Sequence, residues 1–306
     1  GFLARNLALY LKRNYRVILA ARNNERNNHA KAITDCEVIP LDVVNIDAVR
    51  EAIDIYRPRI IIHAAATKYV DLSEIFPNEC IDVNIRGSQN VARAAMDKKV
   101  KTVIGVSTDK AALPCNNMYS MSKAVMERLF IRLDGKTQTR FCCLRFGNIA
   151  WSTGSVFPTW RNMLQSKNKI DTTGFDMSRF FFSVHDAIDM MNDVLSVLDD
   201  LYGKTLAKKM KGVKIEHLLR QFILFYGGSY EKVAARIGER PDECMVGSAE
   251  VAHTAKCIIN NREYYLIDYA FDHLSDLVFP VQASTAETLT TEEIDRLIKS
   301  GFENYS

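Results

Sequence analysis

The sequence predicts an α/β fold in which a doubly wound parallel sheet is followed by a smaller C-terminal lobe. Short apolar runs alternate with amphipathic stretches through the first half of the chain, and strands that alternate with helices form parallel sheets with helices on both faces. Polar residues directly follow these apolar runs. The carboxyl ends of parallel strands are where such folds bind their ligands, so these polar residues are the first candidates for a site.

Each element of the first half follows from the spacing of its apolar residues. Leu3, Leu7 and Leu11 are four residues apart, which predicts a helix at the start of the chain. Strands are predicted over residues 16–21, 38–41, 60–64, 102–106 and 139–144, and helices over residues 46–56, 81–98 and 119–133. This order of elements is typical of successive β-α-β units.

The pattern is looser in the second half of the chain. Residues 151–160 are predicted to form a loop, and residues 175–184 contain a dense aromatic cluster. Helices are predicted over residues 186–198, 214–225 and 289–301, the last with a threonine cap at its start and Gly301 after its last turn. We therefore expect a sheet domain over residues 1–147 and a second lobe over residues 148–306, with residues 176–205 also packing against the first domain.

The composition excludes several classes of protein. Of the 306 residues, 47% are hydrophobic and 25% are charged, which rules out a disordered or collagen-like chain. The net charge of +3 gives little sign of a nucleic-acid partner. No apolar run approaches the ~18 residues of a membrane span, and the opening residues do not resemble a signal peptide, so a cytoplasmic protein is expected. The 7 Cys and 6 His lack metal-ligand spacing, and no metal site is expected.

The strongest local motif is Tyr119 and Lys123, which are four residues apart on a predicted helix and so share one face. A nearby ammonium lowers the pKa of a phenol, which would let Tyr119 act as a base on a sugar hydroxyl. An ordinary surface helix is the alternative, because the motif alone is weak. It gains weight from Thr108, Asp109 and Lys110, which follow the preceding predicted strand.

These residues together resemble the extended short-chain dehydrogenase/reductase superfamily and, within it, the UDP-N-acetylglucosamine 4,6-dehydratases, the CapD-like polysaccharide-biosynthesis proteins. The matching motifs are residues 63–70 (HAAATKYV), Asn84, residues 107–111 (STDKA), Tyr119 with Lys123, residues 145–148 (RFGN), 154–156 (GSV), 176–180 (DMSRF), 236–239 (RIGE) and 289–294 (LTTEEI). Their order along nearly the whole chain is what makes the resemblance specific. It implies a Rossmann-type nucleotide-binding domain followed by a UDP-sugar-binding lobe.

The resemblance implies a lyase that dehydrates UDP-N-acetylglucosamine to a UDP-4-keto-6-deoxy-N-acetylhexosamine for surface glycans. C4 is oxidised, water is eliminated across C5 and C6, and the hydride returns to C6. Tyr119 and Lys123 would act at C4, Asp109 would be the acid of the elimination and Lys110 its base, with Thr108 near the 4-oxygen. A solvated loop pair is the alternative for Asp109 and Lys110.

Arg22, directly after the first predicted strand, indicates the cofactor. An arginine there suits a 2′-phosphate and so favours NADP over NAD, whereas a plain surface arginine is the alternative. The resemblance implies cofactor contacts from Gly1, Phe2, Leu3, Asp42, Val43, Ala64, Ala65, Ala66, Lys68, Asn84, Tyr119 and Lys123.

The resemblance also implies a set of UDP-sugar contacts and a homo-oligomer. The substrate-binding residues would be Lys68, Asn148, Ser155, Val156, Arg179, Lys209, Arg236 and Glu239. For Arg179 two interpretations stay open: a contact to phosphate, or a salt bridge that anchors the two lobes. Neither the number of subunits nor inversion or retention at C5 follows from the sequence.

The chain departs from the family pattern in two places. Trp151, Ser152 and Thr153 stand where relatives commonly have Gly-Ser-Arg, so a substrate-facing cation is replaced and an indole is added. Relatives also begin with a strand and a Gly-x-x-Gly-x-x-Gly loop, of which only the middle glycine is present, as Gly1, with Ala4 at the third position. We expect the first strand to be missing. A UDP-sugar 4-epimerase, or a catalytically weak protein that binds NADP or a nucleotide sugar, are the alternatives.

Overall fold

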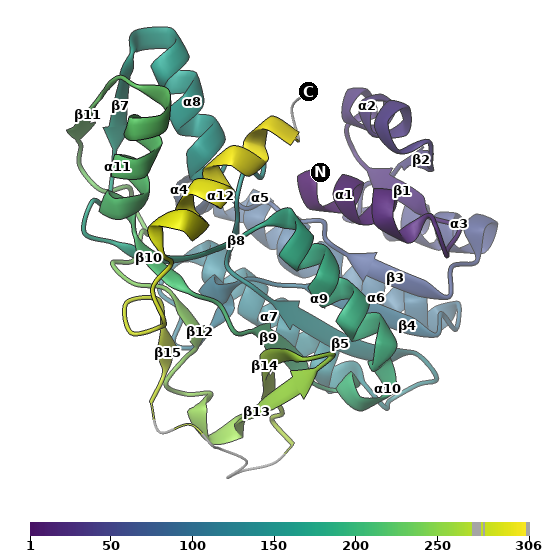
Figure 1. The fold of residues 1–306 in the computed structure, drawn as a ribbon. Coiled ribbons are helices and arrows are strands. Elements are labelled where there is room, and N and C mark those ends of the chain that lie inside the picture. Colours follow the sequence, from purple (N-terminus) through teal and green to yellow (C-terminus); the bar gives the residue numbers. More distant parts are fainter. Residues whose placement is uncertain (271–276, 278, 304–306) are drawn as a thin grey trace.

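The structure is a computed structural model that describes residues 1–270, 277 and 279–303 of the chain. Its main sheet has six strands in the order β13-β14-β9-β5-β4-β3 (Figure 1). Four of them run parallel: β3 (Ile60–His63), β4 (Thr102–Val106), β5 (Arg140–Arg145) and β9 (Thr205–Lys208). The hairpin of β13 (Thr254–Ile259) and β14 (Arg262–Ile267) adds two antiparallel strands beside β9. The predicted α/β fold with a parallel sheet is confirmed.

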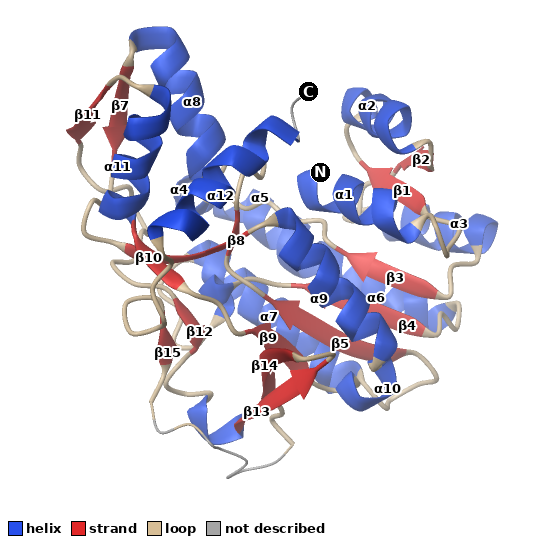
Figure 2. Cartoon of the chain, in the orientation of Figure 1, coloured by secondary structure: helices blue, strands red, loops and turns tan. Residues whose placement is uncertain are grey.

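Helices cover both faces of this sheet (Figure 2). One apolar core takes residues from α3 (Ile46–Tyr56), α6 (Gly87–Asp97) and α7 (Met118–Leu133), and the other from α1 (Phe2–Leu11) and α9 (Val184–Ser196). Because side chains alternate along a strand, neighbouring residues feed opposite cores. Val103 and Cys143 belong to the first core, whereas Ile104 and Cys142 belong to the second. Burial on both faces explains why these strands are continuous apolar runs.

The site-bearing edge also carries several short helical segments. A π-helix over Ile81–Arg86 leads into α6, so the helix predicted over residues 81–98 is present with an irregular first turn. Before it lie α4 (Val70–Ile75) and α5 (Pro77–Cys80). A 3₁₀ turn over Asp109–Ala111 follows β4, and another covers Val251–His253. π-helical turns are frequent at functional sites.

Strands β1 (Ile18–Ala21) and β2 (Glu37–Pro40) form a separate parallel pair, which is not hydrogen-bonded to the main sheet among the described residues. Helix α2 (Asn24–Thr34) connects β1 to β2 and was not predicted from the sequence. Its sequence is mostly polar and lacks an apolar stripe, so the helix is marked mainly by its ends: Asn23 caps the first turn, and Asp35 ends the helix with a φ of 55°.

The second lobe packs around an aromatic core. It contains α8 (Val156–Lys167), α11 (Ile215–Tyr226) and α12 (Thr291–Glu303), with the pair β7 (Lys169–Thr172) and β11 (Ser229–Lys232). Three further strands, β6 (Asn148–Ile149), β8 (Ser178–Phe182) and β10 (Gly212–Lys214), form a small sheet, and β12 (Cys244–Val246) pairs with β15 (Val281–Gln282). This core holds the side chains of Phe157, Trp160 and Phe222.

Two predictions about this lobe were wrong. The loop expected over residues 151–160 gives way to α8 at Val156, because Phe157 and Trp160 are drawn into the aromatic core although Ser155 provides no side-chain cap. Helix α12 continues through Gly301 to Glu303, so that glycine does not end it. Its predicted start is confirmed, since Thr290 and Glu293 bond each other's backbone N–H groups.

The second half of the chain contributes to both lobes. Besides α9 and the short α10 (Leu198–Leu201), three strands of the main sheet, β9, β13 and β14, come from residues after 147. The contribution to the sheet domain therefore extends beyond the residues 176–205 that we expected.

Candidate functional site

The acid–base pair expected at the end of β4 is held in a fixed geometry. Thr108 caps the 3₁₀ turn, and its hydroxyl donates to Asp109 Oδ1 over 2.9 Å. Asp109 is fully buried, and its backbone N–H donates to the carbonyl of Phe146 over 3.0 Å. A Cβ at Gly147 would lie 2.6 Å from Phe180 and 3.1 Å from Asp109 Oδ2, so only glycine fits there. Burial excludes the solvated loop pair as an interpretation of Asp109.

Lys110 lies between two buried carboxylates. Its ammonium is 3.2 Å from Asp109 Oδ1 and 3.3 Å from Glu243 Oε1, and Glu243 Oε1 is in turn 3.8 Å from Arg179 Nε. We refer to these four residues as the Lys110 cluster. Burial alone would lower the pKa of Lys110, but the two carboxylates outweigh it and raise that pKa above its ordinary value. Lys110 is therefore a protonated ammonium in this arrangement.

Glu243 is the residue that the sequence prediction missed. It lies directly before β12, far from Lys110 in the chain and outside any regular apolar pattern. Burial raises the pKa of its carboxyl group, with Lys110 opposing that effect. The only signal in the sequence was its nearness to the 236–239 motif.

Tyr119 and Lys123 are both buried near the start of α7. Burial raises the pKa of Tyr119 to about 12, while the Lys110 ammonium and a hydrogen bond to Thr108 oppose that rise. Burial lowers the pKa of Lys123 to about 8, and its ammonium donates to the carbonyl of Val106 over 2.6 Å. The expectation that Lys123 lowers the pKa of Tyr119 is thus not met here, because the cation that acts on the phenol is Lys110.

Several buried polar atoms at this edge of the sheet have no hydrogen-bond partner among the described residues. They are Ser107 Oγ, Asp109 Oδ2 and Glu243 Oε2. An unpartnered buried polar atom costs free energy and calls for an explanation such as an unseen ligand. The carboxyl end of β4 is therefore the position in the described chain best suited to hold a polar substrate.

The loop after β3 begins with three small, exposed residues, Ala64, Ala65 and Ala66. Asn84 fixes this loop: its side chain accepts from the N–H of Thr67 over 2.8 Å and donates to the carbonyl of Thr67 over 3.0 Å. Its amide also donates to Ser122 Oγ over 2.9 Å, which ties the loop to α7. Asn84 thus holds the loop in place, and its contact with a cofactor stays a prediction.

His63, which precedes this loop, is buried with Nε2 2.9 Å from Ser88 Oγ. Burial, aided by the nearby Lys123 cation, lowers its pKa to about 3, so the imidazole is neutral at ordinary pH. This agrees with a structural role for His63.

Cations gather where α1 begins. Arg5, Arg26 and Lys68 are all close enough to Gly1 that their charge adds to burial in lowering the pKa of its amino group. The neighbouring Phe2 is buried in the core, and Leu3 is half-buried against it. The start of a helix with several cations around it is a favourable position for a phosphate group.

Three of the residues expected to contact the cofactor follow β1 and β2: Arg22 is exposed, Asp42 is half-buried and Val43 is buried. The Arg22 guanidinium donates to Glu79 Oε1 over 3.3 and 3.4 Å in an exposed ion pair. Asp42 Oδ1 accepts from the N–H of Val44 over 3.0 Å, and the carbonyl of the buried Val43 accepts from Asn90. These contacts hold the loop after β2 in place.

The structure brings some of the expected substrate residues together and separates others. Asn148 donates to the carbonyl of Phe180 over 2.9 Å, beside Gly147 and Asp109. Lys68 donates to the carbonyl of Thr153, which joins the loop after β3 to the loop before α8, where Ser155 and Val156 begin the helix. These residues border one edge of the sheet.

Arg179 serves as an anchor between segments. Its guanidinium donates to the carbonyls of Ser178 over 2.9 Å and Arg240 over 2.8 Å and faces Glu243. Because Arg179 and Glu243 both lie in the second half of the chain, the phosphate contact and the salt bridge between lobes both stay predictions.

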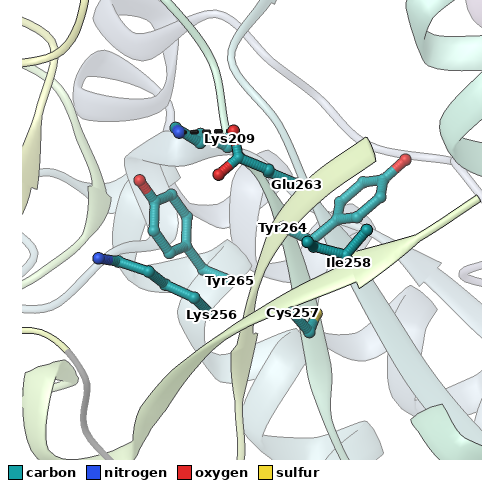
Figure 3. Close-up of a pocket in the computed structure, with 7 residues that line it drawn as sticks. All are labelled: Lys209, Lys256, Cys257, Ile258, Glu263, Tyr264 and Tyr265. Atoms are coloured by element: carbon teal, nitrogen blue, oxygen red, sulfur yellow. Dashed lines mark hydrogen bonds and ion pairs between the residues drawn. The ribbon is translucent and has the colours of Figure 1, made fainter. Parts of the chain in front are cut away.

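Three other expected substrate residues, Lys209, Arg236 and Glu239, make no contact with the Lys110 cluster among the interactions of the described chain. Lys209 donates to Glu263 over 2.6 Å and lines a surface pocket on the β13–β14 hairpin, with Lys256 and Tyr265 beside it (Figure 3). Arg236 is exposed, and its N–H donates to Glu239, whose other oxygen accepts from Thr173. None of these contacts reaches the acid–base pair.

Trp151 does not face a substrate. Its side chain is fully buried among Phe157, Phe222 and Tyr226, and its indole N–H donates to the carbonyl of Leu297 over 2.9 Å. A Cβ at Gly301 would clash with the indole at 2.1 Å. The added aromatic side chain therefore attaches α12 to the lobe.

None of the helices in the described part of the chain is long and apolar enough to cross a membrane. Within the same residues, no three side chains of His, Cys, Asp or Glu lie together as a metal site would require.

Similar proteins include both epimerases and dehydratases. A UDP-glucose 4-epimerase of Rickettsia felis is 34% identical over 216 residues, which cover 69% of this chain and 62% of that relative. An inverting UDP-N-acetylglucosamine 4,6-dehydratase of Campylobacter jejuni is 36% identical over 193 residues, which cover 61% of this chain and 56% of that relative. The chain thus spans about three fifths of the length of these relatives.

Solved structures share the fold. The structure of Pen from Bacillus thuringiensis superposes with a TM-score of 0.86 at 24% identity, covering 96% of this chain and 92% of that one. The dTDP-glucose 4,6-dehydratase DesIV from Streptomyces venezuelae, solved with NAD and TYD bound, gives a TM-score of 0.69 at 19% identity, covering 78% and 83%.

A family model provides the broadest agreement with the sequence. It matches residues 3–262, which include β1 to β9, the Lys110 cluster, Tyr119 and Lys123. The chain therefore belongs to the polysaccharide biosynthesis protein family described by that model.

Proposed function

We propose that the protein is an NADP-dependent 4,6-dehydratase of UDP-N-acetylglucosamine. The observation that carries this proposal is the buried pair of Asp109 and Lys110, whose nitrogen and oxygen are 3.2 Å apart within the Lys110 cluster. Tyr119 with Lys123 suffices for chemistry at C4 alone. A second, separate acid–base pair is what an elimination across C5 and C6 requires.

The described residues suit a nicotinamide dinucleotide. Ala64–Ala66 leave room at the carboxyl end of β3, and Arg5, Arg26 and Lys68 supply positive charge for a diphosphate near Gly1. The Lys123 ammonium has no carboxylate of the described chain within ion-pair distance, which leaves it available to ribose hydroxyls. Arg22 would meet a 2′-phosphate after leaving Glu79. When bound, such a cofactor supplies reversible hydride transfer.

Tyr119 would take the proton of the 4-hydroxyl. Its pKa of about 12 makes the phenol a weak acid in this structure, so the base form depends on the cations nearby. Lys110 already opposes the rise. Lys123, one helical turn away, would add its charge when it holds the ribose beside the phenol.

The elimination follows once C4 is a ketone, because a carbonyl acidifies the hydrogen on C5. The C5–H bond breaks and its proton passes to the neutral amine of Lys110, while its electrons form the C5–C6 double bond. The C6–O bond breaks, and the oxygen takes a proton from the protonated carboxyl of Asp109 and leaves as water. A proton then shifts from Lys110 back to Asp109 across their hydrogen bond, which restores both groups.

The ion pair that the structure contains is the state directly after the chemical step. One proton shift from Lys110 Nζ to Asp109 Oδ1 produces the reactive form, with a neutral amine and a neutral acid. Such a shift removes two opposite charges from a buried site, where charge separation is costly.

The UDP-sugar would lie over the edge bordered by Lys68, Asn148, Ser155 and Val156. Glu239 and Arg236 would meet the nucleotide from the segment that follows β11, and Lys209 from the end of β9. Since Asn148 and Arg179 bond backbone carbonyls, their contribution would be to shape the site.

A UDP-sugar 4-epimerase is the second candidate function, favoured by one specific observation. In the Lys110 cluster the lysine is protonated and shared by two carboxylates, so it is not a free base. If that ion pair never yields a neutral amine, the residues left for chemistry are Tyr119 and Lys123, which act at C4 only.

The mass of the product separates these functions. Purified protein is incubated with NADP and UDP-N-acetylglucosamine, and the nucleotide sugar is analysed by mass spectrometry. We expect the loss of one water without net change in the cofactor. An unchanged mass with a changed sugar configuration would support the epimerase, and binding without turnover would indicate a weakly active binding protein.

We also propose a homo-oligomer. Tyr69, Leu72, Ile75 and Phe76 on α4 and its end, together with Met121 and Val125 on the adjoining α7, are exposed apolar side chains on one region of the nucleotide-binding half. Contiguous exposed apolar surface is typical of an interface between subunits. Light scattering should give a mass above that of the monomer, and Phe76→Glu should reduce it.

A further inference from the structure

Glu243 reaches the acid–base pair from a different part of the chain. It directly precedes β12 in the C-terminal half, and its carbonyl accepts from the N–H of Ala283 over 2.9 Å. Just beyond β12, a Cβ at Gly247 would lie 1.8 Å from the carbonyl of Leu113, so the backbones of the two segments touch. This close packing fixes the position of Glu243 relative to the turn that carries Lys110.

Only one of the two carboxylate oxygens of Glu243 has a partner among the described residues. Its Oε1 faces Lys110 at 3.3 Å and Arg179 at 3.8 Å, while Oε2 has no hydrogen-bond partner among the described residues. Asp109 is arranged in the same way, with Oδ1 on Lys110 and Oδ2 unpartnered. The Lys110 ammonium therefore forms ion pairs with two carboxylates that belong to separate segments of the chain.

A carboxylate placed only for stability would be expected to satisfy both of its oxygens. Burying a charge with incomplete hydrogen bonding is unfavourable, and replacing such a pair by apolar side chains is often neutral or stabilising. The cost is understandable if Glu243 serves the reaction at the neighbouring residue.

We propose that Glu243 is a positioning residue for the elimination, in which its carboxylate fixes the Lys110 ammonium against Asp109. This rests on the proposed function. The titratable and charged groups around Lys110 are Asp109 on its own turn, Glu243, Arg179 on β8 and Tyr119 on α7. Of these, Asp109 and Glu243 contribute most to keeping the lysine protonated, and Asp109 is also the acid of the reaction. Glu243 is therefore the carboxylate that can tune Lys110 without taking part in the chemical step.

Glu243→Gln tests the proposal, because it keeps the size and removes the charge. Loss of an opposite charge within this distance lowers the pKa of a lysine by about one unit or more. The matched control is Asp242→Asn, which removes the neighbouring carboxylate, one that bonds Ser284 instead of Lys110. Glu243→Asp retains the charge and should rescue part of the effect. Thermal melting checks that each variant is folded.

Lys110 is titrated without any need for turnover. The rate at which acetic anhydride labels Lys110 is measured against pH by peptide mass spectrometry in the wild type and the three variants. We expect the labelling midpoint of Glu243→Gln to fall by about one pH unit relative to the wild type and Asp242→Asn. An unchanged midpoint would overturn the proposal.

Kinetics supply the second readout. With UDP-N-acetylglucosamine, Glu243→Gln should lower the plateau value of kcat, because Lys110 is no longer held against Asp109, while leaving KM near the wild-type value. The acidic limb of its kcat profile should move downward by the same shift as the labelling midpoint. A fall in kcat with no movement of that limb would overturn the positioning role. Turnover by the wild type without loss of water would instead overturn the proposed function, whatever the labelling midpoint of Lys110.

Discussion

Two buried ionic clusters lie close together in this molecule and differ in how completely they are hydrogen-bonded. In the first, which we refer to as the Arg145 cluster, the fully buried guanidinium of Arg145 bonds both oxygens of Glu127 and both oxygens of Glu250, and also the carbonyl of Met245. Glu250 accepts further bonds from Gly247 and Tyr269. Every carboxylate oxygen in it accepts at least one hydrogen bond.

The Lys110 cluster is built from similar residues but is incomplete. Asp109 Oδ2 and Glu243 Oε2 remain unpartnered within the described chain. The pKa directions agree with this difference. Burial would raise the pKa of Glu250, but Arg145 and its other partners hold it below the ordinary value, whereas burial prevails at Glu243 and raises its pKa. Complete hydrogen bonding of the carboxylates indicates that the Arg145 cluster stabilises the fold. The unpartnered oxygens of the Lys110 cluster indicate that it binds a ligand.

The largest effect is expected from breaking the fully hydrogen-bonded Arg145 cluster. Arg145→Met leaves Glu127 and Glu250 buried without their cation, which should lower the free energy of unfolding by about 3–5 kcal/mol. Chemical denaturation measures it. Arg50→Met, which breaks an exposed pair with Asp97, is the control and should change stability little. Equal stability of both variants would contradict a structural role for the Arg145 cluster.

The next effect falls on the Lys110 cluster. Lys110→Met should reduce kcat for loss of water by about 10³-fold, since it removes the base. Product formation is followed by mass spectrometry and folding by thermal melting. Lys256→Met on the exposed face of β13 is the matched control and should retain activity. Full activity in Lys110→Met would refute the elimination chemistry.

The third expected effect is smaller: the affinity for NADP should depend on pH. Burial lowers the pKa of Lys123 to about 8, below its ordinary value near 10.5, so this ammonium loses its charge as the pH rises through 8. If the charged form holds the ribose, the Kd for NADP should rise by about tenfold per pH unit above pH 8. Fluorescence titration between pH 7 and 9.5 measures it.

The lowered pKa of Lys123 also makes the stability of the fold depend on pH. Because the folded pKa of Lys123 lies below the unfolded one, keeping it charged costs stability below pH 8, and that cost is relieved between pH 8 and 10.5. Lys123→Met should bind NADP weakly at all pH values. A flat Kd in the wild type across this range would contradict the role given to Lys123.

The smallest effect concerns the choice of cofactor. Arg22→Ala should weaken NADP binding by about tenfold and leave NAD binding nearly unchanged, because only NADP carries the 2′-phosphate that the guanidinium would meet. Glu79→Gln is a useful companion, since it frees Arg22 from its exposed pair and should strengthen NADP binding slightly. An equal effect of Arg22→Ala on both cofactors would make Arg22 a plain surface residue.

The sequence predicted best where local pattern and tertiary environment agree. Strands β4 and β5 are buried on both faces and β3 is half-buried, so each contains an apolar run that is visible without the structure. Helix α8 was missed because its start has no cap and its stability comes from Phe157 and Trp160 meeting Phe222, which lies far along the chain. The β13–β14 hairpin was missed for the same reason, since β14 gains its place by pairing with β9.

In the site, too, contacts between neighbouring residues could be predicted and contacts between distant segments could not. Asp109 and Lys110 are consecutive residues at the end of a strand, so their pairing could be predicted. Glu243 and Lys110 meet only because β12 packs against the turn after β4, which no spacing in the sequence encodes. The burial of Trp151 could not be predicted because it depends on α12, and in particular on the small Gly301 next to the indole.

The central claim is that the Lys110 cluster removes the hydrogen on C5, and the most direct test runs the reaction in D₂O. Removal of that hydrogen by a solvent-exchanging lysine and its replacement at the end of the reaction should place one deuterium at C5 of the dehydrated product, as read by NMR. Lys110→Met should incorporate none. A product whose C5 hydrogen comes entirely from the substrate would contradict the account and leave chemistry at C4 alone.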